Sequence, residues 1–198
     1  MNGPEAGRPE HGESIGEEPQ IYVASLSDYN AGILHGEWIS AETDPDTVQG
    51  SVDRMLAASP TARRFGDIAE EWAIHDFSGF GAVRLSEHED LERVCAIARG
   101  ISTHGEPFAA WVADRDDDES PDNEGFEEDY LGEWASATDW AESLLEDIGV
   151  SLDNLDQVPE SLQPYVHIDV QGWVRDMQID GEVSVVDSKA GVYVFWRR

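Results

Sequence analysis

The sequence predicts an α+β protein made of three small modules. Short stretches near both ends of the chain, residues 21–26 and 192–196, have the composition and alternation of β-strands. Between them, apolar residues recur at helical spacing behind good helix-capping residues. Turn-forming residues interrupt the pattern so often that several small modules are favoured over one larger globule.

Changes in composition set the expected module boundaries. The first residues are Gly, Pro, Glu and Ser with Ile15 as the one aliphatic side chain, which predicts disorder up to Gln20. The expected division is a disordered acidic extension (1–19), an N-terminal small α/β module (20–80), a mainly helical acidic middle module (81–133) and a C-terminal α+β module (134–198).

In the first module, a strand at residues 21–26 is expected to end in the turn-forming run 27–32. Residues 37–39 and 71–77 would add two more short strands to the sheet. Asp44 is a good N-cap and Pro45 suits the first helical position, so a helix should begin there and end before the break at Ser59-Pro60. Its buried face would consist of Val48, Val52, Met55 and Leu56.

In the middle module, Ser86 and Glu89 have the spacing of a capping box, and Gly100 fits the position after the end of that helix. A further helical patch covers residues 107–113. In the last module, Ser136 and Asp139 indicate another capped helix that ends at Gly149. The apolar stripe of this helix consists of Trp140, Leu144, Leu145 and Ile148. A later helix is marked by Tyr165, Ile168, Trp173 and Met177. Two strands, at 183–186 and 192–196, are expected to flank a five-residue hairpin loop, 187–191.

The charge is the most unusual property of the chain. Forty-three Asp and Glu residues against twelve Lys and Arg give a net charge of −31. Direct binding to nucleic acid is disfavoured, because contacts to phosphates need Lys and Arg. Between Glu106 and Asp156 there are 18 acidic residues and one basic residue, Arg115. The expected partners are therefore basic.

Most other classes of function are disfavoured. A single cysteine, Cys95, excludes an internal disulfide, and the scattered histidines lack zinc spacing. Neighbours in a strand point to opposite faces, which argues against a catalytic dyad of His75 and Asp76. No membrane span or secretion signal is recognised. We expect a cytoplasmic protein that is not an enzyme and has no cofactor and no metal.

Three interpretations of the acidic stretch compete. It could be a solvated loop, but Phe126, Tyr130, Trp134 and Trp140 are interleaved with its charges. It could be an EF-hand calcium loop starting at Asp116, but the position that needs glycine is Pro121. It could also mimic duplex DNA: at one charge per ~1.7 Å, the net charge matches about 15 base pairs.

Four segments, in the expected order, resemble the ArdA antirestriction family. They are residues 21–39, with Ile21-Tyr22-Val23-Ala24-Ser25-Leu26-Ser27-Asp28-Tyr29-Asn30-Ala31-Gly32 as the most specific part; residues 70–80; the acidic block that closes in Trp140-Ala141-Glu142-Ser143-Leu144-Leu145-Glu146-Asp147-Ile148-Gly149; and Trp173-Val174-Arg175-Asp176-Met177 with the terminal strand. The extra N-terminal segment departs from the family pattern, and the run 114–119 is rich in acid.

The resemblance implies an elongated, curved protein, usually a homodimer joined through its C-terminal half and carried by a mobile element. Its carboxylates would stand where DNA phosphates stand, and its target would be the methyltransferase core of type I restriction–modification enzymes. Tyr22, Tyr29 and Trp38 are expected to be core and turn residues rather than partner contacts.

The candidate partner-binding residues are the acids of the middle and the outward acids of the following helix: Asp114, Asp116, Asp117, Asp118, Glu119, Asp122, Glu124, Glu127, Glu128, Asp129, Glu133, Asp139, Glu142, Glu146 and Asp147. Two rival functions stay open. One is an acidic, chaperone-like protein that binds basic proteins such as histones. The other is an unrelated activity in a salt-adapted protein, although salt adaptation spreads acids over the whole surface.

Overall fold

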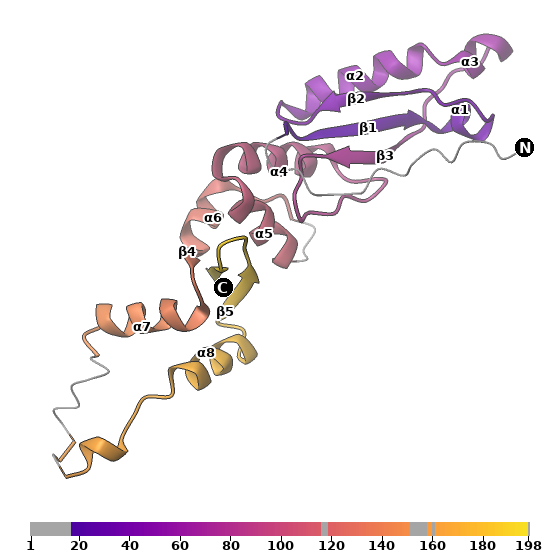
Figure 1. Ribbon diagram of the computed structural model, residues 1–198. Helices are drawn as coiled ribbons and strands as arrows, with labels where there is room; N and C mark the ends of the chain where they lie inside the picture. Colours follow the sequence, from indigo (N-terminus) through magenta and orange to yellow (C-terminus); the bar gives the residue numbers. More distant parts are fainter. Residues whose placement is uncertain (1–16, 116–118, 151–157, 160, 198) are drawn as a thin grey trace, which may run out of the picture. The chain divides into compact units, whose positions relative to one another are not determined.

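The computed structural model describes residues 17–115, 119–150, 158–159 and 161–197. It confirms the α+β class, with helices and two three-stranded antiparallel sheets (Figure 1). The chain divides into two compact units, Met1–Glu124 and Gly125–Arg198. The division into three modules stays a prediction, and the disorder expected for residues 1–16 lies outside the described part of the chain.

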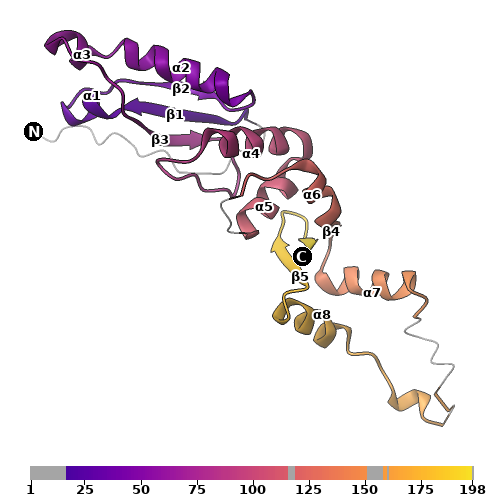
Figure 2. The same cartoon turned by 180° about the vertical axis from the view of Figure 1, so that it is seen from behind.

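The sheet of the first unit has the strand order β2-β1-β3. Its strands are β1 (Gln20–Ser25), β2 (Gly36–Ser40) and β3 (Trp72–Ser78), so the three predicted strands are confirmed. Ile21, Val23 and Ile39 are buried under α2 (Pro45–Ala57). In the reverse view of Figure 2, α2 lies across the sheet beside α4 (Leu91–His104), which it contacts. The two helices bury the apolar face of the sheet.

The predicted start and buried face of α2 are confirmed. The Asp44 carboxylate accepts a hydrogen bond of 2.8 Å from the Thr47 backbone N–H. Two short helices that flank α2 in the sequence or pack beside the first sheet were not predicted. The run 27–32 begins as α1 (Leu26–Asn30), because Ser25 caps it, and the Ser59-Pro60 break is the start of α3 (Pro60–Phe65), where the Ser59 hydroxyl accepts from the Ala62 N–H at 3.1 Å.

Two expectations for α4 were wrong. The Glu89 carboxylate accepts hydrogen bonds from the Ser86 N–H and hydroxyl, which is half of a capping box, but this pair precedes the helix, whose N-cap is Asp90. Gly100 does not follow the helix; α4 continues to His104, and Gly105 ends it with a φ of 73°. Gly100 lies under the ring of Phe108 from α5 (Glu106–Arg115), where a Cβ would collide with the ring. Glycine there lets the two helices pack closely.

The ordered chain begins before Gln20, which corrects the expected limit of the extension. The Pro19 carbonyl accepts a hydrogen bond of 2.8 Å from the Ala41 N–H, and the Glu17 carboxylate accepts one of 3.0 Å from the Ser78 hydroxyl. These bonds fix residues 17–19 against the chain next to β2 and β3. Polar hydrogen bonds hold this segment, so its lack of apolar residues was not a sign of disorder.

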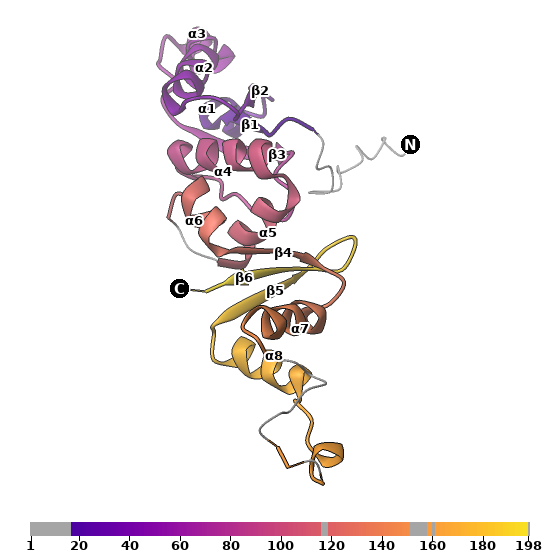
Figure 3. The same ribbon diagram turned by 90° about the vertical axis from the view of Figure 1, so that its left-hand side faces the viewer.

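The sheet of the second unit has the order β4-β6-β5, with β4 (Tyr130–Trp134), β5 (Val183–Asp187) and β6 (Val192–Trp196). The helix α6 (Asn123–Asp129) leads into β4. The helices α7 (Ala137–Asp147) and α8 (Val170–Ile179) lie on one side of the sheet (Figure 3). The predicted hairpin is confirmed, but Asp187 pairs with Val192, so its loop has four residues, 188–191, and not five.

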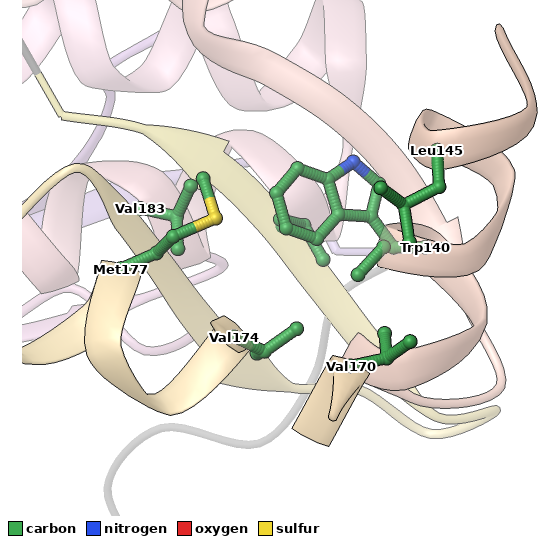
Figure 4. Packing of buried hydrophobic residues seen from close by; sticks show 8 residues of the cluster. Trp140, Leu145, Val170, Val174, Met177 and Val183 are labelled. Atoms are coloured by element: carbon green, nitrogen blue, oxygen red, sulfur yellow. The ribbon is translucent and has the colours of Figure 1, made fainter. Parts of the chain in front are cut away.

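A compact cluster of apolar side chains joins α7, α8 and the sheet. Figure 4 shows Trp140 and Leu145 from α7 facing Val174 and Met177 from α8. The predicted stripe of α7 is therefore partly right, although Ile148 is 63% exposed. The last predicted helix begins later than expected, because Asp169 caps α8 through the Gly172 N–H at 2.9 Å. Tyr165 belongs to a short 3-10 helix, Gln163–Tyr165.

Candidate functional site

The acidic stretch begins at the end of α5 and is anchored to α4. Arg93 of α4 is 8% exposed. Its Nε donates a hydrogen bond of 3.2 Å to the Glu119 carbonyl, and its Nη1 lies 3.5 Å from the Glu89 carboxylate. The buried Arg93 thus fixes the chain at Glu119. Residues 116–118 lie outside the described residues, and with them the expected first residue of the calcium loop, Asp116. The side chain of Glu119 itself stays exposed.

The structure places most of the predicted acids on the surface of their own unit. Exposed are Glu119, Asp122, Glu124, Glu127, Glu128, Glu133, Asp139, Glu146 and Asp147, and half-buried are Asp114 and Glu142. Asp116, Asp117 and Asp118 are not described. Glu119, Asp122 and Glu124 belong to the first unit. The six exposed acids of the second unit are called the acidic surface below: Glu127, Glu128, Glu133, Asp139, Glu146 and Asp147.

Asp129 does not belong to this surface. It is 5% exposed, and Phe126, three residues earlier on α6, is 2% exposed. Residues three apart share one face of a helix, so Asp129 lies on the inward face of α6 with Phe126. Glu127 and Glu128 lie on the outward face. The sequence alone could not distinguish these faces, because α6 contains only one large apolar residue.

The helix α7 separates its apolar and acidic residues. Ser136 caps it: the Ser136 hydroxyl accepts from the Asp139 N–H at 3.1 Å and donates to the Asp139 carboxylate at 2.6 Å. Trp140, Ala141 and Leu145 are buried in the core of the unit. Asp139, Glu146 and Asp147 are exposed, as the sequence predicts, whereas Glu142 is half-buried.

Two helices of this region end in acids. The last residues of α6 are Glu127, Glu128 and Asp129, those of α7 are Glu146 and Asp147, and neither helix has a basic residue in its last turn. The C-terminal end of a helix carries a partial negative charge, so each exposed carboxylate there costs about 0.3–1 kcal/mol of stability. The dipole of α7 therefore does not stabilise Glu146 and Asp147, which are exposed at its C-terminal end.

Glu133 extends the acidic surface across the sheet of the second unit. Its carboxylate accepts a hydrogen bond of 2.6 Å from the Ser188 hydroxyl in the hairpin loop. Burial, and to a smaller extent the charge of Glu133, raise the pKa of Tyr130 on the same strand. Tyr130 therefore stays neutral, and the negative charge of this strand comes from the carboxylate.

A second group of acids, which the sequence analysis did not single out, surrounds Trp72 in the first unit. Trp72 lies at the start of β3 and lines two shallow hollows. The acids around them are Asp46, Glu70, Glu71, Glu89, Asp90 and Glu92. Three separate segments supply these residues, so only the fold brings them together. The sequence signals were the pair Glu70-Glu71 and the run 87–92.

Of the three aromatic residues assigned to core and turn, Trp38 and Tyr29 are exposed and Tyr22 is half-buried. Trp38 is 46% and Tyr29 is 53% exposed. The Tyr22 and Trp38 rings pair across β1 and β2 with their centres 5.5 Å apart. Trp38 is therefore not a core residue, because α2 covers only the other face of this sheet. The Tyr29 ring meets the His75 ring edge-on at 4.7 Å.

The described residues offer no site for a metal ion: no group of three or more His, Cys, Asp or Glu side chains has the required arrangement. The Asp76 carboxylate accepts a hydrogen bond of 2.8 Å from the Phe77 N–H, while His75 contacts Tyr29. Cys95 is buried, and this burial raises the pKa of its thiol. In the part of the chain that the structure describes, every helix is too short or too polar to span a membrane.

A family model described as "Antirestriction protein (ArdA)" matches residues 21–191. The matched range contains both sheets, the acidic surface and the acids around Trp72. No curated protein matches the chain.

Proposed function

Because this chain belongs to the ArdA family of antirestriction proteins, we propose that it inhibits type I restriction–modification enzymes by occupying their DNA-binding site in place of duplex DNA. The observation that carries the proposal is the acidic surface. Its carboxylates are exposed on α6, β4 and α7, and those of Glu146 and Asp147 lie at the C-terminal end of α7, where the helix dipole disfavours negative charge.

The physical basis of binding is a distributed field. A DNA-binding groove lined with Lys and Arg gathers anions, and a ligand that replaces them releases those ions to the solvent. A protein with a net charge of −31 supplies the matching potential and is steered into such a groove. The same charge repels duplex DNA, so the protein would act on the enzyme and not on its substrate.

The target surface in this proposal is the methyltransferase core, the part of a type I enzyme that holds duplex DNA. Inhibition of cleavage is the expected effect, and an assay of methyl transfer decides whether modification is blocked as well. The expected place of action is the cytoplasm, where restriction takes place. An elongated three-module form belongs to the same proposal, and small-angle X-ray scattering tests it.

We also propose that the protein is a homodimer that uses the second unit. The support is a set of large apolar side chains exposed in that unit: Ile148, Leu162, Tyr165, Val166 and Ile179. Exposed apolar residues on a small domain favour association. Light scattering at micromolar concentration should give twice the mass of the chain, and a strict monomer would count against this part of the proposal.

The function is tested by adding the purified protein to a type I enzyme and an unmodified plasmid. We expect cleavage to stop near one inhibitor dimer per binding site, whereas the protein alone leaves duplex DNA unshifted in a gel. Adding a histone in excess separates mimicry from general binding of basic proteins. An acidic chaperone would be titrated away by the histone, while a shape-matched inhibitor would keep most of its effect.

A further inference from the structure

The short helix α3 and the turn after it carry exposed basic and apolar side chains. No residue of α3 is buried. Arg63 and Arg64 are exposed, and Phe65 and Ile68 are 71% and 77% exposed. These four residues are called the α3 tip. In Figure 1, α3 lies at the end of the first unit where β1 runs into α1. A basic tip cannot contribute to phosphate mimicry, so it needs another explanation.

The position of α3 is fixed, although it adds nothing to the core. The Asp28 carboxylate on α1 is fully buried, and its Oδ1 accepts a hydrogen bond of 2.8 Å from the Thr61 N–H of α3. Ser59 caps the start of α3, and Gly66 ends it with a φ of 70°. Burying a carboxylate has a desolvation cost. The buried carboxylate thus holds in place a helix whose side chains are exposed to solvent, as expected of an element that binds a partner.

The charges of the α3 tip have no partner in the described chain. Neither Arg63 nor Arg64 forms an ion pair with a described residue, and the Arg64 guanidinium lies 5.5 Å from the centre of the Phe65 ring. The sequence has only one other adjacent pair of basic residues, Arg197-Arg198. Arg beside an exposed aromatic ring is typical of the energetic centre of a protein–protein interface.

The chemistry of the tip selects its partner. Guanidinium groups pair with carboxylates or phosphates, but a chain with a net charge of −31 is repelled by duplex DNA. Phe65 and Ile68 further require an apolar surface, which a phosphate backbone does not offer. A protein surface with carboxylates around an apolar patch satisfies both requirements.

We propose that the α3 tip binds an acidic, partly apolar patch on the restriction enzyme, outside its basic DNA-binding groove. This inference rests on the proposed function and adds a contact that DNA itself does not make. It would give the inhibitor specificity for its target, because a basic groove alone accepts many polyanions. The two arginines would also be kept away from the repulsive basic groove.

The test asks whether added negative charge at the α3 tip strengthens or weakens binding to the enzyme. The double variant Arg63→Glu/Arg64→Glu makes the chain more negative by four charges, since each exchange removes one positive and adds one negative charge. A groove-only mimic would then bind its target more tightly. If the α3 tip meets carboxylates, the same variant should bind about tenfold more weakly, the loss typical of an interface anchor. Binding is measured with the intact enzyme by fluorescence anisotropy.

The matched control is Arg84→Glu/Arg175→Glu, which changes two other exposed arginines and gives the same net charge. It should bind as tightly as the wild type or more tightly. Phe65→Ser should weaken binding several-fold without a change in charge. All variants should keep the wild-type melting temperature, because the exchanged side chains are exposed.

Two failures can be distinguished. If the wild type does not bind the enzyme at all, the proposed function fails and this inference fails with it. If the wild type binds and Arg63→Glu/Arg64→Glu binds equally or more tightly, the inference alone is overturned. A gel shift of duplex DNA that depends on Arg63 and Arg64 would likewise overturn it in favour of a nucleic-acid contact.

Discussion

The buried carboxylate of Asp28 and the backbone N–H of Thr61 join α1 to α3 across 33 residues of sequence through a hydrogen bond of 2.8 Å. Burial by itself would raise the pKa of Asp28. The hydroxyls of Thr61, Ser59 and Ser25 and the Thr61 N–H outweigh this effect, so that the pKa lies well below its usual value. The folded protein therefore holds Asp28 as a carboxylate.

Asp28→Asn should lower the free energy of unfolding by about 1.5–3 kcal/mol at pH 7, the range for hydrogen bonds to a charged group. A lowered pKa stabilises the fold above the unfolded pKa of aspartate, and the contribution is lost as the pH falls toward the folded pKa. The difference between wild type and variant should thus be constant above about pH 5 and shrink below about pH 4. Urea unfolding of both proteins across this range is the measurement; a difference that grows in acid would contradict the assignment.

The glycines at positions 50 and 100 both lie inside helices, but alanine should have opposite effects there. A Cβ at Gly100 would collide with the Phe108 ring, so Gly100→Ala should destabilise the first unit by about 1–3 kcal/mol. Gly50 on α2 has no atom within 4 Å of such a Cβ, so Gly50→Ala should stabilise by about 0.5–1 kcal/mol. The melting temperatures of the Gly50→Ala and Gly100→Ala variants are compared with that of the wild type. Equal shifts of the same sign would show that α5 does not pack on Gly100.

Carboxylates at the two ends of α7 should respond differently to substitution. Glu146→Lys places a cation at the C-terminal end of the helix and should raise stability by about 0.3–1 kcal/mol, while it weakens inhibition. Asp139→Asn, at the other end, loses the charged part of the Ser136 cap and should lower stability by a few tenths to about 1 kcal/mol. Melting temperature and inhibition are measured on the same samples. A Glu146→Lys variant that inhibits as well as the wild type would remove Glu146 from the acidic surface.

No single carboxylate should dominate inhibition. An exposed ion pair contributes about 0.2–1 kcal/mol, so Glu128→Gln should weaken binding only a few-fold. Neutralising Glu127, Glu128, Glu133, Asp139, Glu146 and Asp147 together should cost about 1–6 kcal/mol if the contributions add roughly. The sextuple variant should also depend less on salt than the wild type, because it displaces fewer ions. An all-or-none loss from one residue would indicate a localised site instead.

Much of the fold could be predicted because its signals are local. Asp44 with Pro45, and Ser136 with Asp139, mark α2 and α7 within four residues of sequence. Elements without such local signals depend on tertiary contacts. The strand β4 has Gly132 at its centre, which weakens the strand signal in the sequence, and it forms by pairing with β6.

The acidic surface was predictable in composition but not in its details. The exposed acids of α7 follow from the helical period, because the apolar stripe defines the opposite face. Asp129 could not be placed, since α6 offers no such stripe. The acids around Trp72 come from three segments that the fold brings together, so the pair Glu70-Glu71 and the run 87–92 did not reveal the group by themselves. The α3 tip is contiguous in sequence, but its exposure depends on how α3 is held outside the core.

The central claim is that this protein takes the place of duplex DNA. It is tested most directly by titrating the protein into a preformed complex of a type I methyltransferase core with fluorescent duplex, followed by anisotropy. Full release of the duplex, with an apparent affinity that falls as the duplex concentration rises, is the predicted result. A stable ternary complex, in which the duplex stays bound while the protein is also bound, would contradict the account.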